Sequence, residues 1–153
     1  MDIDGVLNSS EYFKSVGYNK KLGFNDIDVT KVILLKQIYD TCNAKIVLSS
    51  SWRGLIGTKH YSYLEKILHK HSMNIMSHTP IIEQNRPLEI KSWLENMPNK
   101  SDIKFVSLDD DYSYQDYCKY GIGNCLVKTS FYEPNGGLRQ EHVNKAIKIL
   151  MGK

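Results

Sequence analysis

Two aspartates, Asp2 and Asp4, stand at the start of the chain with one residue between them, and Gly5 follows. Where a strand opens into a loop, carboxylates at this spacing converge on one centre. One of them can attack phosphorus while the other moves a proton, and together they can hold a hard cation through oxygen. The ordinary alternative is an acidic turn on the surface, so the surrounding elements must decide between the two interpretations.

A second acidic group, Asp109, Asp110 and Asp111, comes directly after the strand-like run 103–108. Adjacent carboxylates at the end of a strand repel one another, and a bound divalent metal ion offsets that repulsion. The alternative is an acidic loop that faces Lys or Arg. The three aspartates are therefore candidate metal ligands.

Two further groups have the chemistry to bind an anion. Ser49 and Ser50 follow the apolar run 44–48, and hydroxyl and backbone N–H groups at a strand end can hydrogen-bond phosphate oxygens. Arg86 precedes Pro87 where a helix is expected to begin, so its cation is placed to receive an anion. Taken singly, the simpler explanations are a serine-rich turn and a solvated arginine.

Hydrophobic spacing predicts the elements that must position these residues. Apolar residues at helical spacing predict helices at 29–42, 60–71, 87–97 and 141–151. Short apolar runs predict strands at 44–48, within 75–82, and at 103–108 and 125–128. Residues 8–27 are polar, aromatic and glycine-containing, which predicts a long loop. This order is typical of an α/β fold with a mainly parallel sheet flanked by helices, in which ligands bind beyond the carboxyl ends of the strands.

Length and composition indicate a single globular domain over residues 1–153. Hydrophobic residues are 41% and charged residues 24%, which argues against a disordered or coiled-coil protein. The net charge of +3 permits a nucleic-acid partner without requiring one. No apolar run approaches the roughly 18 residues of a membrane helix, and the start of the chain lacks the pattern of a signal peptide. Because the three cysteines are also widely spaced, we expect a cytoplasmic protein without a membrane partner.

The order of the motifs is more specific than any one of them. The chain resembles the haloacid dehalogenase (HAD) superfamily of aspartate-nucleophile phosphohydrolases, and within it the HAD domain of the Swiss Army Knife RNA repair proteins. The features that carry this resemblance lie at 2–8, 45–53, 86–94, 108–111 and 137–143. They extend over nearly the whole chain.

The resemblance implies a Rossmann-like HAD core and gives roles to the acidic residues. Asp2 is expected to attack the phosphoryl group and form an aspartyl-phosphate, while Asp4 protonates the leaving group and later activates water. Mg²⁺ is expected to be held by the carboxylate of Asp2, the backbone carbonyl of Asp4, and Asp109, with Asp110 as the second candidate. A cation suits this place, because a phosphate ester and two carboxylates repel one another.

The resemblance also implies that Ser49, with Ser50 beside it, binds the phosphoryl oxygens. Arg86 takes the place of a basic residue that is usually lysine in this family. A guanidinium forks onto two oxygens where lysine is a point charge, so the charge is kept while the geometry changes.

No sizeable cap domain is expected, because the segments after Asp4 and between Ser51 and Arg86 are short and supply elements of the core. An open site suits a phosphate on a large substrate, such as an RNA or DNA end. Residues with the chemistry to contact such a chain are the basic Lys14, Lys20, Lys21, Arg53 and Lys59, and the aromatic Tyr12, Phe13, Tyr18 and Trp52. The alternative for each is an ordinary place in a loop or in the packing.

The sequence starts one residue before Asp2, so the first central strand of the HAD sheet is expected to be missing at the N-terminus. An upstream start, a fragment, and a domain that has decayed or borrows a strand are three explanations. The leading function is a Mg²⁺-dependent phosphatase acting on a macromolecular phosphate. The alternatives are an inactive or truncated phosphate-binding module, and a protein phosphatase or phosphotransferase with the same chemistry. The oligomeric state and companion domains stay open.

Overall fold

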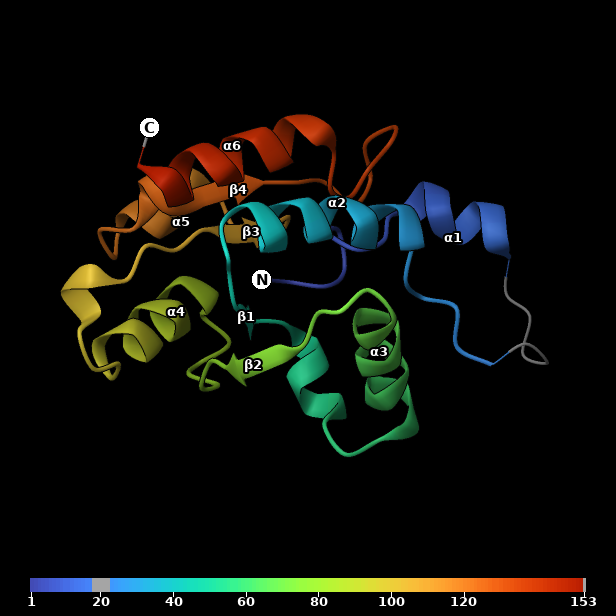
Figure 1. Ribbon diagram of the computed structural model, residues 1–153, viewed down its shortest axis with the longest axis horizontal. Coiled ribbons are helices and arrows are strands. Elements are labelled where there is room, and N and C mark those ends of the chain that lie inside the picture. Colours follow the sequence, from blue (N-terminus) through green and yellow to red (C-terminus); the bar gives the residue numbers. More distant parts are fainter. Residues whose placement is uncertain (18–22, 153) are drawn as a thin grey trace.

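The computed structural model describes residues 1–17 and 23–152 and has a mixed α/β architecture (Figure 1). The α-helices are α1 (Ser10–Val16), α2 (Val29–Thr41), α3 (Lys59–Lys70), α4 (Arg86–Glu95), α5 (Tyr114–Cys118) and α6 (Gln140–Met151). The strands are β1 (Ile46–Leu48), β2 (Ile75–His78), β3 (Ser107–Asp109) and β4 (Leu126–Lys128). Short 3-10 helices lie at η2 (Ser51–Leu55), η3 (Lys100–Asp102) and η4 (Gly123–Cys125). The alternation of helices and strands and the small Rossmann-like fold agree with the prediction.

The strands form two separate parallel pairs, β1 with β2 and β3 with β4, and the N-terminal residues run between them (Figure 1). The amine of Met1 donates to Val47 O of β1 (2.9 Å), and the carbonyl of Met1 accepts from Ser49 N (2.8 Å). On the other side, Asp2 N donates to Leu108 O of β3 (3.0 Å). These bonds bring Asp2 to the carboxyl ends of both β1 and β3.

A cavity of about 530 Å³ lies in the gap between the two sheets. Residues 44–47 line it from the side of β1 and residues 102–108 from the side of β3, and Met1 lines it as well. The gap agrees with the prediction that a central strand is missing. It also explains why the strand expected at 103–108 is confined to Ser107–Asp109, since 103–106 pair with no strand in the described part of the chain.

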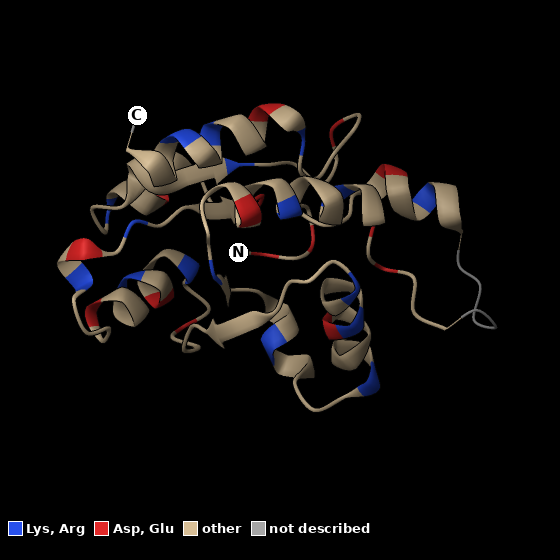
Figure 2. Cartoon of the chain, viewed as in Figure 1, with Lys and Arg blue, Asp and Glu red and all other residues tan. Residues whose placement is uncertain are grey.

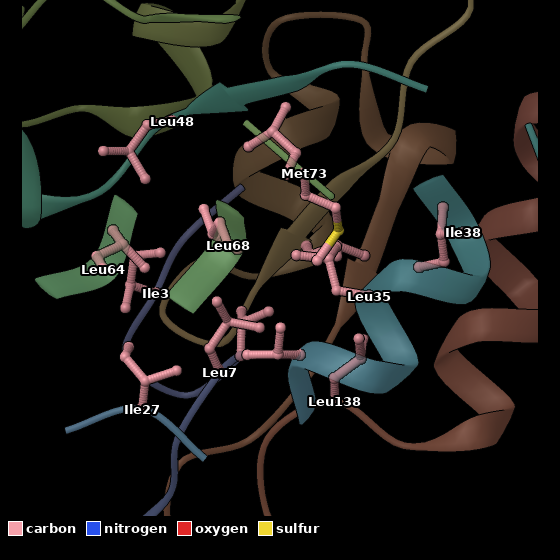
Figure 3. Packing of buried hydrophobic residues seen from close by; sticks show 14 of the residues in the cluster. Ile3, Leu7, Ile27, Leu35, Ile38, Leu48, Leu64, Leu68, Met73 and Leu138 are labelled. Atoms are coloured by element: carbon pink, nitrogen blue, oxygen red, sulfur yellow. The ribbon is translucent and has the colours of Figure 1, made fainter. Parts of the chain in front are cut away.

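The main hydrophobic core fixes the turn that follows the first aspartate. Ile3, Val6 and Leu7 are fully buried. Ile3 and Leu7 enter the same cluster as Leu64 and Leu68 of α3 (Figure 3). Because burying one such side chain contributes roughly 1.5–3 kcal/mol, the turn is held firmly although it is neither helix nor strand.

Two helices depart from the sequence prediction. The loop expected over residues 8–27 contains α1, whose first turn is capped by Ser9 and which buries no residue. The sequence does not predict α5 either, a short helix that begins with a reciprocal capping pair between Ser113 and Asp116. Both helices are stabilised by local capping and lack the apolar stripe by which the sequence identifies a helix.

Charges are mixed on the helix surfaces. Helices α2, α3, α4 and α6 each carry residues of both signs, and acidic residues mark the N-terminal segment between the sheets (Figure 2). Within residues 1–17 and 23–152, no helix combines the length and the apolar character that crossing a bilayer requires.

Candidate active site

A tight turn carries the first acidic segment past the carboxyl ends of β1 and β3. Val6 N and Leu7 N both donate to Ile3 O (3.1 and 2.8 Å). Gly5 has a φ of +72°, in the left-handed region that favours glycine. A Cβ on Gly5 would lie 2.1 Å from Cγ of Asp110. Glycine is therefore required both by the backbone conformation and by the close approach of the second acidic segment.

Distant segments hold this turn through its backbone. Thr129 Oγ1 donates to Gly5 O (2.6 Å), and Leu138 N donates to Val6 O (2.8 Å). Asn8 Oδ1 accepts from Gly5 N (2.9 Å). These bonds satisfy buried backbone groups of the turn, so the segments after β4 and before α6 help to fix the first aspartates.

Arg86, the first residue of α4, lies between the two acidic segments. Its Nη1 is 2.7 Å from Asp2 Oδ2 and 2.6 Å from Asp109 Oδ1, and its Nη2 is 3.5 Å from Asp111 Oδ2. The guanidinium carbon lies 5.3 Å from the centre of the Tyr112 ring. Burial alone would lower the pKa of Arg86, but the carboxylates of Asp109 and Asp2 raise it above its ordinary value. Arg86 therefore stays charged and ties the two acidic segments together.

Asp2 is buried beside this cation. Its Oδ1 accepts from Ile3 N (2.7 Å), while its Oδ2 faces Arg86. Burial raises the pKa of Asp2 and Asp109 adds to the rise, whereas Arg86 and the Ser50 hydroxyl act in the opposite direction. The charge on Asp2 is thus controlled by its immediate neighbours.

Asp109 is fully buried and hydrogen-bonded through both of its oxygens. Its Oδ1 accepts from Arg86 Nη1 (2.6 Å) and from Asp111 N (2.9 Å). Its Oδ2 accepts from the Tyr117 hydroxyl (2.7 Å), which also lies 2.7 Å from the Ser107 hydroxyl. This carboxylate is already fixed by protein donors.

Asp110 is in a different situation. In the described part of the chain, no side-chain donor or cation is bonded to its carboxylate. Burial raises the pKa of Asp110 to about 7, and the negative charges of Asp111, Asp2 and Asp109 contribute to the rise. Among these acids, Asp110 is the one whose ionisation most needs an additional cation.

The carboxylates of Asp2, Asp109, Asp110 and Asp111 converge on one place, where each offers an oxygen within 4.8 Å of the others. One guanidinium faces them, so the cluster carries an excess of negative charge. Mg²⁺ is bound by carboxylate oxygens and water. The donor set and its charge therefore fit a magnesium ion.

The carboxylate of Asp4 lies outside this cluster and is held separately. Its Oδ1 accepts from Asn8 Nδ2 (2.8 Å), and its Oδ2 accepts from Trp52 Nε1 (3.0 Å). Asn8 is fully buried, and its amide also donates to Asp26 O (3.0 Å). Two side chains thus fix the orientation of a half-buried carboxylate next to the acidic cluster.

The predicted phosphate-binding serines lie at the end of β1, and both are buried. Ser49 Oγ accepts from Thr79 Oγ1 (3.2 Å), and Ser49 lines the cavity between the sheets. Ser50 Oγ accepts from Trp52 N (3.3 Å), and its hydroxyl lowers the pKa of Asp2. Ser50 is therefore the serine whose hydroxyl acts on the predicted nucleophile.

For Arg53, the structure supports an ordinary place in the packing over a position that flanks a nucleic-acid chain. Its Nη2 lies 2.8 Å from Glu89 Oε2 in a buried ion pair, and its Nη1 donates to Thr79 Oγ1 and Pro80 O (both 2.7 Å). Glu89 Oε1 accepts from Ile82 N (2.9 Å). Arg53 and Glu89 thus hold the loop after β2 in place.

For Trp52 the structure likewise supports a place in the packing over a surface for stacking on bases, because its side chain is only 4% exposed and its indole N–H is bonded to Asp4. Tyr12 donates its hydroxyl hydrogen to a backbone carbonyl (3.0 Å), and Phe13 packs against another ring at 6.1 Å. The other residues expected near a nucleic acid are Lys14 and Lys59, which are exposed, and Tyr18, Lys20 and Lys21, which lie outside the described residues.

Sequence reasoning misses two residues that hold the acids in place. Tyr117 bonds to Asp109 but lies in α5, where the sequence has no apolar spacing to reveal it. Asn8 bonds to Asp4, and its position four residues later, within the first motif, is the one available signal.

The comparisons with known proteins bear on the whole of this site. A family model described as the HAD domain in Swiss Army Knife RNA repair proteins matches residues 1–143. No curated protein and no solved structure matches the chain. The matched region includes both acidic segments, the serines after β1 and Arg86, and it ends inside α6. The chain therefore belongs to the family of HAD domains found in Swiss Army Knife RNA repair proteins.

Proposed function

We propose that this chain is a Mg²⁺-dependent phosphohydrolase whose nucleophile is Asp2. Membership of the family supports a phosphohydrolase of the HAD type. The observation that carries the finer proposal is the convergence of four carboxylates on one place, where the buried guanidinium of Arg86 pairs with those of Asp2 and Asp109. One carboxylate of such a group can attack phosphorus while others hold a metal ion.

In this reaction an oxygen of Asp2 attacks phosphorus, and the bond between phosphorus and the ester oxygen breaks. Water then attacks the phosphorus of the aspartyl-phosphate, which releases inorganic phosphate and restores the carboxylate. Arg86 orients Asp2 through the 2.7 Å ion pair and places a positive charge next to the transferring group. Mg²⁺, when bound, supplies the further positive charge that screens the phosphate from the carboxylates.

The contacts favour Asp110 over Asp109 as the metal ligand of the second acidic segment. Arg86 and Tyr117 already occupy both oxygens of Asp109, so we assign Asp109 to the positioning of Arg86. Among the described residues Asp110 lacks such partners. Its pKa rises to about 7 through burial and through the neighbouring negative charges, and a metal ion would offset both effects. Asp2 and the backbone carbonyl of Asp4 complete the proposed ligand set.

Asp4 gives a proton to the leaving oxygen and later takes one from the attacking water. The N–H groups of Trp52 and Asn8 bond to its two oxygens, which limits rotation of the carboxylate. A fixed carboxylate beside the nucleophile suits a proton transfer, because such transfers require hydrogen-bond contact in a defined geometry.

The proposed substrate is a phosphorylated RNA or DNA end. The matching family consists of HAD domains in RNA repair proteins. The segment between η2 and β2 consists mainly of α3, whose Leu64 and Leu68 are buried in the core, so it is part of the domain core and does not form a cap. Exposed Lys14 and Lys59 add positive charge outside the acidic cluster.

The test is phosphate release from RNA oligonucleotides with a 3′- or a 5′-phosphate and from a small aryl phosphate, with Mg²⁺ and with chelator. We expect metal-dependent release that is lost in Asp2→Asn. Asp40→Asn is the matched control, because Asp40 is an exposed carboxylate paired with Lys36 far along α2. Release that persists in Asp2→Asn, or that ignores the chelator, would contradict the proposal.

A binding module without turnover is the second candidate, and one observation favours it. Arg86 holds Asp2 and Asp109 in short ion pairs, an arrangement that also stabilises a resting carboxylate. This candidate predicts that inorganic phosphate binds, that the binding weakens in Arg86→Gln, and that no substrate is turned over.

A further inference from the structure

Four rings form a continuous row that begins at Asp4. Trp52 donates from Nε1 to Asp4 Oδ2 (3.0 Å). The Trp52 and His60 rings lie 4.6 Å apart, and His60 stacks on Phe24 at 4.2 Å with an angle of 6° between the planes. Tyr63 lies 6.0 Å from Phe24 and closes the group.

Phe24 is the exposed ring of this row. Its side chain is 44% exposed, although one face of the ring is stacked on His60, whereas Trp52 is only 4% exposed. Leaving this much of a phenylalanine ring in water forgoes part of the hydrophobic stabilisation that its burial would give. The row therefore changes from buried at Asp4 to open at Phe24.

The segment behind Phe24 is fixed by polar contacts. Asp26 Oδ2 lies 3.0 Å from His60 Nε2, and Asp26 O accepts from Asn8 Nδ2 (3.0 Å). Ile27 N donates to the Tyr63 hydroxyl (3.4 Å). These contacts hold the stacked pair in one orientation, so a ligand that stacks on Phe24 would meet a preformed surface.

The row lies on the side of the site where the leaving group departs. Asp4 is the residue to which the proposed mechanism gives the protonation of the leaving oxygen, and Trp52 connects Asp4 directly to the rings. Asp110 belongs to the acidic cluster, whereas the Asp4 carboxylate lies outside it and is bonded to Asn8 and Trp52. A group attached to the leaving oxygen would therefore extend toward Phe24.

The distance along the row distinguishes two kinds of aromatic leaving group. The ring of a phosphotyrosine is bonded directly to the ester oxygen, so it would have to lie against Asp4, where Trp52 is buried. In a nucleotide, the ribose separates the ester oxygen from the base, which allows the base to reach the open face of Phe24. Stacking of bases on exposed aromatic rings is also tolerant of sequence, as a repair substrate would require.

From this geometry we infer that Phe24, stacked on His60, is the binding subsite for the nucleobase on the leaving-group side of a phosphorylated nucleic-acid end. The inference rests on the proposed function for the position of the leaving group. It assigns Phe24 to substrate binding, whereas Asp2 and Asp4 carry out the proposed chemical steps.

The first test compares wild type, Phe24→Ala and Phe24→Trp on a short phosphorylated RNA and on the same RNA with an abasic terminal nucleotide. Phe24→Ala should raise KM for the intact RNA about ten-fold with little change in kcat, and Phe24→Trp should return KM to the wild-type value. Wild type and Phe24→Ala should bind the abasic RNA with equal affinity. Tyr132→Ala is the matched control, because Tyr132 is another exposed aromatic residue, at 84%.

A second test measures binding of the same two RNAs by fluorescence anisotropy with chelator present, so that it does not depend on turnover. An approximately ten-fold weaker binding of the intact RNA by Phe24→Ala alone supports the subsite even if the phosphatase proposal fails. Equal losses for intact and abasic RNA would overturn the subsite. So would a phosphotyrosine peptide whose binding depends more strongly on Phe24 than that of the RNA.

Discussion

The carboxylate of Asp110, to which no described side chain is bonded, should make the metal-free protein less stable as the pH rises. Its pKa in the folded state is raised to about 7 from an ordinary value of 3.8, so the folded state binds this proton more tightly than the unfolded chain does. The contribution of Asp110 to the free energy of unfolding is fully present below pH 4 and is lost as the pH rises to 7. Asp110→Asn removes the charge with little change in shape, so it should flatten this part of the profile.

The size of this loss of stability follows from the rise in the pKa of Asp110. A raise of about three pKa units corresponds to about 4 kcal/mol if the site were fully shielded from solvent. Asp110 is half-buried, so solvent screening reduces the expected loss to about 2 kcal/mol. For a chain of this length, that loss corresponds to a melting temperature lower by roughly 4–8 °C.

Other charged groups surround Asp110, so the comparison must be a difference between two proteins. They are Asp2, Asp109, Asp111 and Arg86, with Lys128 donating to the backbone carbonyl of Asp110. The Met1 amine, whose pKa burial lowers to about 6, acts in the opposite direction, because its contribution to stability rises with pH between 6 and 8. These groups are present in both proteins, so they largely cancel in the difference.

The assay is urea unfolding of wild type and Asp110→Asn at pH 4, 5, 6, 7 and 8 with chelator. We expect similar stabilities at pH 4, a difference that grows as the pH rises toward 7, and a variant that is more stable by about 2 kcal/mol at pH 8. Adding Mg²⁺ at pH 8 should stabilise wild type much more than the variant. Identical pH slopes in the two proteins would refute the reasoning.

Three other substitutions or extensions give further tests. Gly5→Ala should unfold the site and abolish metal-dependent stabilisation, since its Cβ would lie 2.1 Å from Cγ of Asp110 at a φ of +72°. An unchanged melting temperature would contradict this close contact. Tyr117→Phe should lower the free energy of unfolding by about 1–3 kcal/mol, because it removes a donor to the buried Asp109. Urea unfolding measures this loss, and the absence of a loss would show that the bond does not stabilise the fold. An extension of about five apolar residues before Met1 should enter the cavity between the sheets and raise the melting temperature by several degrees. A Gly/Ser extension of equal length is its control, and equal melting temperatures would exclude the cavity as the place of binding.

The sequence predicts an element correctly where the residue types and their spacing are compatible with only one kind of secondary structure. Helices α2 and α6 follow from their apolar spacing, and α4 follows from Pro87 in its first turn. The apolar pattern at 103–108 predicts a longer strand than β3, because such a pattern reports burial and does not reveal whether a neighbouring strand is present to pair with. Helix α1 was missed because its stability comes from the Ser9 cap and leaves no apolar pattern.

The sequence predicts which strand ends carry the residues of the candidate site. It predicts less well which side chains contact one another there. The rule that ligands bind at the carboxyl ends of parallel strands selects Asp2 and Asp109 together, and the structure places both against Arg86. The exposed or buried state of an aromatic residue cannot be read in this way. The sequence leaves Trp52 open as a stacking surface or a packed residue; in the structure it is buried and bonded to an acid, and Phe24 is an exposed ring.

The most direct measurement of the central claim is to trap and locate the phosphorylated residue. Wild type, Asp2→Asn and Asp4→Asn would each be mixed with a ³²P-labelled aryl phosphate and Mg²⁺, quenched in acid and digested. An aryl phosphate suits Asp4→Asn, because its leaving group departs with little help from an acid while the slow attack of water lets the intermediate accumulate. We predict hydroxylamine-sensitive label on the N-terminal peptide, strongest in Asp4→Asn and absent in Asp2→Asn. Turnover without any labelled peptide, or label that survives in Asp2→Asn, would contradict Asp2 as the nucleophile.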